Sequence, residues 1–183
     1  MARILAALVG TLILSVSVSG SPTAAGSEAA TACRMSAFRL RLGPWISEAT
    51  GQHTLALRLV SQSASSCVLK GYPSVTLSDR AGPVPFLIRH GGDQMITSRP
   101  PTRVLVRPGR GAFVLMNHYR CDRGDLRATT VVKIGLRGHT RREIATLRLT
   151  DPYRMPNYCG PGDPGSVLTV SPFEPTLRSA FVP

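Results

Sequence analysis

Apolar and polar residues alternate along this chain in short runs, and a period of two is the pattern of half-buried β-strands. The clearest run covers residues 53–61, where leucines at every second position, Leu55 to Leu59, face inward and Ala56 and Arg58 face solvent. No segment keeps an apolar period of 3.6 residues over three turns, so we expect essentially no long helix. The other predicted strands cover residues 33–42, 67–79, 84–88, 104–106, 112–116, 130–136, 144–149 and 167–170.

The run over residues 67–79 is the one around which we expect the sheets to be organised. Its second half alternates strictly, with Val75 and Leu77 pointing inward. Gly71 gives the backbone freedom and Pro73 removes a ladder donor, so a bulge or a switch between sheets is expected at this point.

Turn residues separate the runs and define how the strands connect. Residues 138–142 form a hairpin loop between the strands 130–136 and 144–149, and Pro85 within the run 84–88 is typical of an edge strand. Seven to nine short strands with turn signals between them predict an all-β, immunoglobulin-like sandwich of two sheets with Greek-key connections.

The N-terminal residues have the composition of an export signal. A short basic start is followed by an apolar stretch over residues 4–18 and then by small residues. We therefore expect residues 1–25 to be a signal peptide and residues 26–32 a disordered leader. The β-sandwich domain is expected over residues 33–172, with residues 173–183 as a C-terminal tail. The mature chain is expected to be secreted, without lipidation and without a transmembrane segment.

The four cysteines, Cys33, Cys67, Cys121 and Cys159, predict two disulfides, because their number is even and the chain is expected to be exported. No two of them lie in a C-x-x-C spacing, which argues against a zinc site. Three pairings are possible from the sequence. Cys33–Cys67 with Cys121–Cys159 is favoured, because each bond closes a loop of a few dozen residues and would stabilise the fold by roughly 3–4 kcal/mol.

The formal charge of +12 arises almost entirely from arginine. One interpretation is attraction to anionic envelope polymers or lipid head groups; the other is a basic composition spread over solvated strand faces, as at Arg39, Arg41 and Arg58. Because the chain is expected to be exported, we do not expect intracellular nucleic acid to be a partner. The arginines that we consider for anion contact lie in two connections: Arg99, Arg103, Arg107 and Arg110 in one, Arg137, Arg141 and Arg142 in the other.

Three tyrosines, Tyr119, Tyr153 and Tyr158, lie close to Cys121 or Cys159 in the sequence. If the second disulfide gathers them on one face, their rings could stack on sugars, and neighbouring arginines could hold anionic substituents. The alternative is that the rings cover the disulfide and a thin end of the core. The neighbouring arginines are Arg120, Arg123 and Arg154.

The sequence contains no pattern that names a reaction. There is no Gly-x-Ser-x-Gly elbow, and no two histidines share a metal-ligand spacing, so we expect no catalytic residue, metal or cofactor. His118, near Asp122 and Asp125, is the best acid–base cluster, and a polar strand end is the favoured interpretation. An enzyme acting on cell-wall carbohydrate would need two carboxylates facing one cleft. Its candidates are Asp122, Asp125, Asp151 and Asp163.

Two longer patterns carry a family resemblance. The first is Cys67-Val68-Leu69-Lys70-Gly71-Tyr72-Pro73, and the second is Val104-Leu105-Val106-Arg107-Pro108-Gly109-Arg110-Gly111-Ala112. With the four cysteines, they resemble a secreted actinobacterial family of unknown function that is marked by Cys-x-Leu-x-Gly-Tyr-Pro. The resemblance covers residues 33–172 and implies an immunoglobulin-like sandwich, two disulfides and export. It implies no activity.

These features together favour a secreted, non-enzymatic β-sandwich module that contacts anionic envelope components or a protein partner. A secreted enzyme of cell-wall carbohydrate and a host-facing adhesin that uses the tyrosines are the alternatives.

Overall fold

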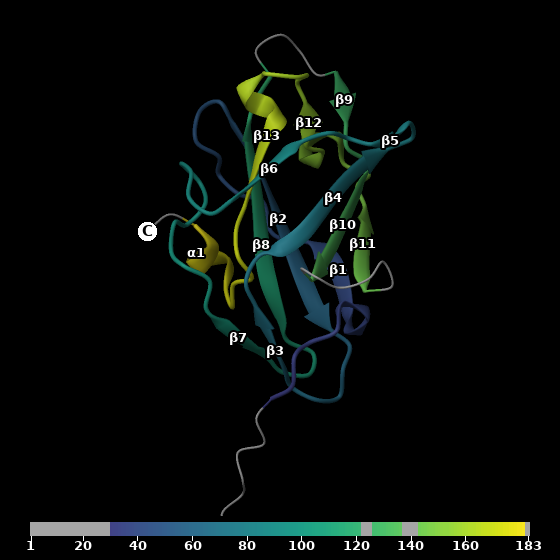
Figure 1. The fold of residues 1–183 in the computed structure, drawn as a ribbon, viewed down its shortest axis with the longest axis vertical. Coiled ribbons are helices and arrows are strands. Elements are labelled where there is room, and N and C mark those ends of the chain that lie inside the picture. Colours follow the sequence, from purple (N-terminus) through teal and green to yellow (C-terminus); the bar gives the residue numbers. More distant parts are fainter. Residues whose placement is uncertain (1–29, 122–125, 137–142, 182–183) are drawn as a thin grey trace, which may run out of the picture.

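The computed structural model describes residues 30–121, 126–136 and 143–181, and the fold of these residues is almost entirely β (Figure 1). The largest sheet has five strands. Its order is β1 (Phe38–Leu42), β2 (Gln52–Ser61), β8 (Gly111–Tyr119), β13 (Val167–Val170) and β6 (Leu87–His90). All neighbours are antiparallel except β13 and β6, which run parallel at the edge.

A four-stranded sheet faces the first one. Its order is β11 (Ile144–Arg148), β10 (Val131–Leu136), β4 (Pro73–Asp79) and β5 (Gly82–Pro83). Two further pairs complete the sheets of the described chain: β3 (Cys67–Lys70) with β7 (Arg103–Val106), and β9 (Arg127–Ala128) with β12 (Asn157–Tyr158). The helical elements are η1 (Met35–Ala37), η2 (Pro152–Arg154), η3 (Pro164–Ser166) and α1 (Leu177–Ala180). None of the helices in these residues is long and apolar enough to cross a membrane.

The core lies between the two large sheets. Leu57 of β2 and Val114 of β8 are completely buried, and so are Val132 and Ile134 of β10 on the opposite side. They belong to one continuous apolar cluster, as expected when the inward positions of two facing sheets interdigitate. The prediction of an all-β sandwich is confirmed. The thirteen strands exceed the predicted seven to nine, because the described chain adds two-residue pairings and the run 67–79 divides in two.

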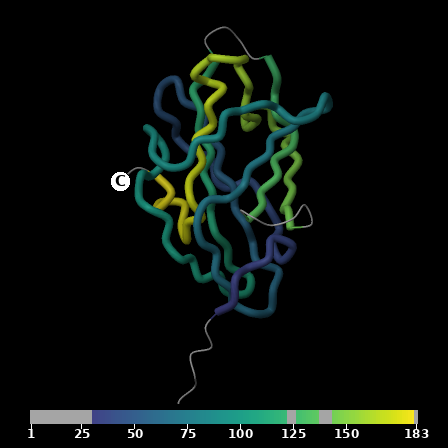
Figure 2. The backbone as a smooth tube through the Cα atoms, in the orientation of Figure 1, coloured from purple at the N-terminus to yellow at the C-terminus, as the bar shows by residue number. Residues whose placement is uncertain are grey.

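The run 67–79 changes sheets at Gly71, as its turn residues predicted. Residues up to Lys70 pair with β7, and residues from Pro73 pair with β10. Gly71 has φ +87°, which L side chains rarely adopt, and its carbonyl accepts a hydrogen bond of 3.0 Å from the Phe173 amide. Figure 2 shows the chain crossing at this point from the β3–β7 pair to the four-stranded sheet.

Two predicted strand boundaries were wrong. The run 33–42 forms a strand only from Phe38, because η1 precedes that strand and places the fully buried Met35 in the core. The first three residues of the run 84–88 are not in a strand, since β5 ends at Pro83 and β6 begins at Leu87. Prolines lack the amide donor that a ladder needs. Both β5 and β6 are edge strands, as the proline indicated.

The five-stranded sheet is covered on its outer face as well. Ala56 and Leu115, which point away from the main core, are 1% and 0% exposed beneath a second apolar cluster. The cover consists of Met95, Ile96 and α1, which lies against β8 in Figure 1. The alternation in β2 had assigned Ala56 to solvent, and this assignment was wrong.

The segments that we expected to flank the domain make ordered contacts with it. At the N-terminal side, Ala32 forms a parallel β-bridge with Val68. At the C-terminal side, the amide and carbonyl of Glu174 bond to Phe113 at 3.0 and 2.8 Å, and Phe173 is completely buried. The packed structure therefore continues beyond Pro172.

We predict that Phe173→Ala destabilises the domain by about 3–5 kcal/mol, because it leaves a cavity between the sheets and the C-terminal segment. Urea unfolding measures the effect. Leu87→Ala is the control, since Leu87 is 65% exposed and its loss should change the free energy of unfolding little. Equal effects of the two substitutions would contradict a structural role for the C-terminal segment.

Candidate binding sites

The favoured cysteine pairing is confirmed. Cys33 bonds to Cys67 with their Cα atoms 4.9 Å apart, and Cys121 bonds to Cys159 with a Cα separation of 5.1 Å. The first disulfide holds the N-terminal segment against β3, where the Cys33 amide also donates to the Val68 carbonyl at 3.0 Å. The second joins the residues that follow β8 and β12.

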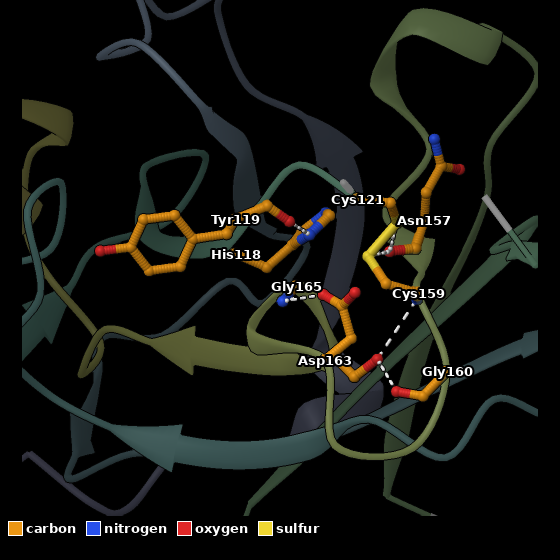
Figure 3. Close-up of a disulfide and its surroundings, with 9 residues drawn as sticks. His118, Tyr119, Cys121, Asn157, Cys159, Gly160, Asp163 and Gly165 are labelled. Carbon is orange, nitrogen blue, oxygen red and sulfur yellow. Dashed lines mark hydrogen bonds between the residues drawn. A yellow bond between two sulfur atoms is a disulfide. The ribbon is translucent and has the colours of Figure 1, made fainter. Parts of the chain in front are cut away.

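A tight loop packs directly on the second disulfide (Figure 3). The Asp163 carboxylate accepts from the Gly165 amide at 2.8 Å, and the Ser166 hydroxyl donates to the Gly160 carbonyl at 2.5 Å. A side chain at Gly165 would overlap Cys159 Sγ and would lie 2.6 Å from the Tyr119 carbonyl oxygen. A glycine is therefore required for the loop to approach the disulfide and the end of β8.

His118 is buried beside this loop and 3% exposed. Its Nδ1 lies 2.6 Å from the Tyr119 carbonyl oxygen; because a carbonyl only accepts, Nδ1 carries the proton and donates. The ring packs 5.1 Å from that of His53 and 5.7 Å from that of Phe86. Burial, and next the neighbouring His53, lower the pKa of His118 from 6.5 to about 4. The side chain is neutral at physiological pH, as suits a buried ring at a strand end.

The pKa of His118 predicts how stability depends on pH. Because the folded pKa of about 4 lies below the ordinary value of 6.5, the stability from the neutral ring is present above pH 6.5 and is lost as the pH falls towards 4. A shift of this size corresponds to about 3 kcal/mol. Urea unfolding at pH 7 and pH 5 should show a clear loss in the native chain and a smaller one in His118→Asn.

Two carboxyl groups could affect the same measurement. Arg127 hydrogen bonds hold the pKa of Asp79 at about 2, so Asp79 stays ionised over this range. Burial raises the pKa of Glu174, and its protonation favours the folded state on acidification, which opposes the effect of His118. Both groups are retained in His118→Asn. Identical pH dependence of the variant and the native chain would contradict the assignment to His118.

The three tyrosines near the second disulfide do not share one environment. Tyr158 is 7% exposed, and its ring meets the Phe86 ring edge-on at 5.5 Å. Tyr119 and Tyr153 are 45% and 79% exposed. Tyr158 therefore covers the core, and the other two rings are available to a ligand.

Two cavities adjoin Arg120 and Cys121, one beside each exposed tyrosine. A cavity of about 500 Å³ also contacts His53, His118, Pro152, Tyr153 and Asn157. A cavity of about 480 Å³ also contacts Gly51, Tyr119, Asp163 and Pro164. The Arg120 guanidinium itself is bound to the Glu48 carboxylate at 2.9 Å. Tyr119 and Tyr153 thus lie beside two different cavities, which share Arg120 and Cys121 as lining residues.

Arg154, the other described arginine of that group, contacts an aromatic residue that our sequence analysis did not select. Its guanidinium lies 5.1 Å from the centre of the Trp45 ring and donates to the Gly43 carbonyl at 2.7 Å. Trp45 is 63% exposed. Arg123 lies outside the described residues.

The predicted basic connections can be placed only in part. Arg99, Arg103, Arg107 and Arg110 are all exposed, and Arg103 lies directly opposite Lys70 in the β3–β7 pair. Arg137, Arg141 and Arg142 lie outside the residues that the structure describes.

A different group of arginines is brought together by strand register. Arg39 and Arg41 of β1 and Arg58 of β2 are exposed on the outer face of the five-stranded sheet, and Arg41 lies directly opposite Arg58. We call these three residues the arginine row. The Arg58 guanidinium lies 5.9 Å from the centre of the Phe113 ring on β8. Across residues 30–121, 126–136 and 143–181, no carboxylate lies within 4.0 Å of the row's guanidinium groups.

The described carboxylates are largely occupied in holding turns and loops. Asp93 accepts from the Met95 and Ile96 amides, both at 2.7 Å, and Glu48 accepts from the Thr54 amide at 2.6 Å. Asp79, Asp151 and Asp163 accept from the amides of Ala81, Tyr153 and Gly165. Among the arginines that the structure describes, Arg120 and Arg127 form ion pairs within 4.0 Å, with Glu48 and Asp79.

Of the four carboxylates considered for carbohydrate hydrolysis, Asp122 and Asp125 lie outside the described residues. Asp163 contacts the cavity beside Tyr119, and Asp151 is not among the residues around that cavity. The described part of the chain also holds no group of three or more histidine, cysteine or acidic side chains arranged to hold a metal ion.

Comparison with known families places the chain. The model of a domain of unknown function, DUF4232, matches residues 33–174, which include all four cysteines. The chain belongs to this family. Neither the curated proteins nor the solved structures contain a match. The DUF4232 match defines the domain boundaries as residues 33–174. It assigns no activity to the domain.

Proposed function

We propose that this DUF4232 domain is an exported, non-enzymatic module that binds phosphate-bearing anions of the cell envelope through the arginine row. The observation that carries the proposal is the position of Arg41 directly opposite Arg58 without a carboxylate partner in the described chain. Like charges at paired positions of antiparallel strands destabilise a sheet. An anionic ligand would remove this repulsion and gain hydrogen bonds from the planar guanidinium groups.

The row continues into one of the predicted basic connections. Arg39 is paired with Val60, and Val60 is paired with Gly111 of β8. Arg110 precedes Gly111, and its carbonyl accepts from the Ser61 amide at 2.8 Å. The basic turn before β8 therefore lies at the same end of the sheet, and an extended anionic polymer or a lipid surface could contact both.

The cysteines support export of the chain, and the positive charge supports an anionic partner. Two disulfides are typical of oxidising, exported environments, in agreement with the expected signal peptide. The formal charge of +12 attracts anions over a distance set by ionic strength. Lipid head groups and wall polymers share the phosphate chemistry that the row would recognise.

We predict that Arg39→Gln/Arg41→Gln/Arg58→Gln lowers partitioning onto anionic vesicles about 100-fold at low salt, since each arginine near an anionic surface contributes about 1 kcal/mol. Co-sedimentation with phosphatidylglycerol–phosphatidylcholine vesicles measures the effect, and inorganic polyphosphate tests the polymer source. Binding to polyphosphate alone would identify a polymer partner; binding to vesicles alone would identify a lipid surface. High salt should abolish either interaction.

The control variant, Arg80→Gln/Lys133→Gln/Arg148→Gln, removes the same charge from the other sheet and its turn. All three of these side chains are exposed, and Lys133 and Arg148 belong to β10 and β11. Equal losses of binding in both variants would show that net charge alone governs binding and would refute a specific role for the arginine row. Binding that survives high salt would also refute it and would direct attention to the exposed aromatic residues.

A further inference from the structure

A third cavity, of about 400 Å³, lies on the outer face of the five-stranded sheet near the end of β8. Asn117 of β8, Thr169 of β13 and Arg89 of β6 contribute to it, and these three residues occupy paired positions across neighbouring strands. Side chains at paired positions point to the same face of a sheet. The side chains of Asn117, Thr169 and Arg89 therefore form the floor of the cavity.

The loop after β6 forms one wall and carries a fixed carboxylate. Asp93 Oδ1 accepts from the backbone amides of Met95 and Ile96 at 2.7 Å, and Oδ2 accepts from the Asn117 side-chain Nδ2 at 2.8 Å. Asn117 is 1% exposed and is itself held by Gln52 Oε1 at 2.7 Å. The carboxylate is thus held in place beside the cavity before any ligand arrives, which reduces the entropy lost on binding.

Two polar side chains of the floor remain without a partner in the described residues. Thr169 is 4% exposed and lines the cavity, and no hydrogen bond involves its hydroxyl within the ranges that the structure describes. The Arg89 guanidinium has neither an ion pair nor a hydrogen bond in the same part of the chain. Within the described residues, the Thr169 hydroxyl and the Arg89 guanidinium are therefore available to bond to a ligand that enters the cavity.

An aromatic ring stands at the rim. Tyr119 is two residues beyond Asn117 on β8, so the period of two places both on the same face. The residue is 45% exposed and lines the cavity, with Pro164 and Val167 among the other lining residues. An exposed ring beside planar hydrogen-bonding groups offers an apolar surface and polar contacts to one ligand.

We propose that this cavity binds a saccharide that carries a carboxylate, such as a hexuronic acid. The Arg89 guanidinium matches a carboxylate in a two-pronged contact. Asp93 accepts from sugar hydroxyls, the Thr169 hydroxyl donates to or accepts from them, and the apolar face of the sugar ring stacks on Tyr119. The volume lies within the range of about 300–1,000 Å³ that is usual for small-molecule sites. This site is separate from the arginine row and does not depend on it.

The test uses methyl β-D-glucuronide and methyl β-D-glucoside as probes, with binding followed by amide chemical shifts of the isotope-labelled domain. We expect the glucuronide to shift the amides of Asn117, Thr169 and Gln94, and the neutral glucoside to bind about tenfold more weakly. Arg89→Gln should reduce the affinity for the glucuronide to that for the glucoside. Thr169→Val, which keeps the shape of the side chain, should weaken both.

Tyr119→Ala should weaken both sugars about tenfold, because it removes the stacking surface. Arg148→Gln is the matched charge control on the other sheet and should leave both affinities unaltered. Absence of shifts at the three amides, equal affinity for the two sugars, or shifts confined to the surroundings of Arg120 and Tyr153 would each overturn the proposal. None of these results would alter vesicle or polyphosphate binding by the arginine row, so the two proposals fail independently.

Discussion

The pairing of β2 with β8 is the interaction on which the other features depend. Its register runs from Gln52 opposite Tyr119 to Val60 opposite Gly111, and the ladder is buried on both faces over its central part. A shift by one residue would exchange the inward and outward side chains of either strand. The register therefore fixes the main core and, at the same time, the sequence of side chains along the outer face.

The outer face has three zones in the order that this register imposes. Polar residues surround Asn117 at one end, Ala56 and Leu115 form an apolar centre, and Arg58 lies at the other end. Met95, Ile96 and α1 cover the centre, because apolar surface is removed from water there. The cavity lies at the end with Asn117, and the arginine row lies at the opposite end with Arg58.

Much of the fold could be predicted from the sequence, because alternation, turn residues and cysteine spacing are local signals. Leu57 and Gly71 behave as their neighbours in the sequence indicate. The burial of Ala56 could not be predicted, since a small residue at an outward position does not reveal that a distant segment covers it. The candidate sites were harder, because only strand register places Arg41 opposite Arg58. The same holds for the cavity, whose floor joins residues from three distant strands.

We infer that the arginine row favours binding at the expense of stability. Thermal unfolding of the native chain and of Arg41→Gln, with and without inorganic polyphosphate, tests this most directly. We predict that Arg41→Gln unfolds at a higher temperature than the native chain in the absence of polyphosphate, because repulsion across β1 and β2 is relieved. We also predict that polyphosphate raises the unfolding temperature of the native chain more than that of the variant. A lower unfolding temperature of the free variant, or equal stabilisation of both chains by polyphosphate, would contradict this inference.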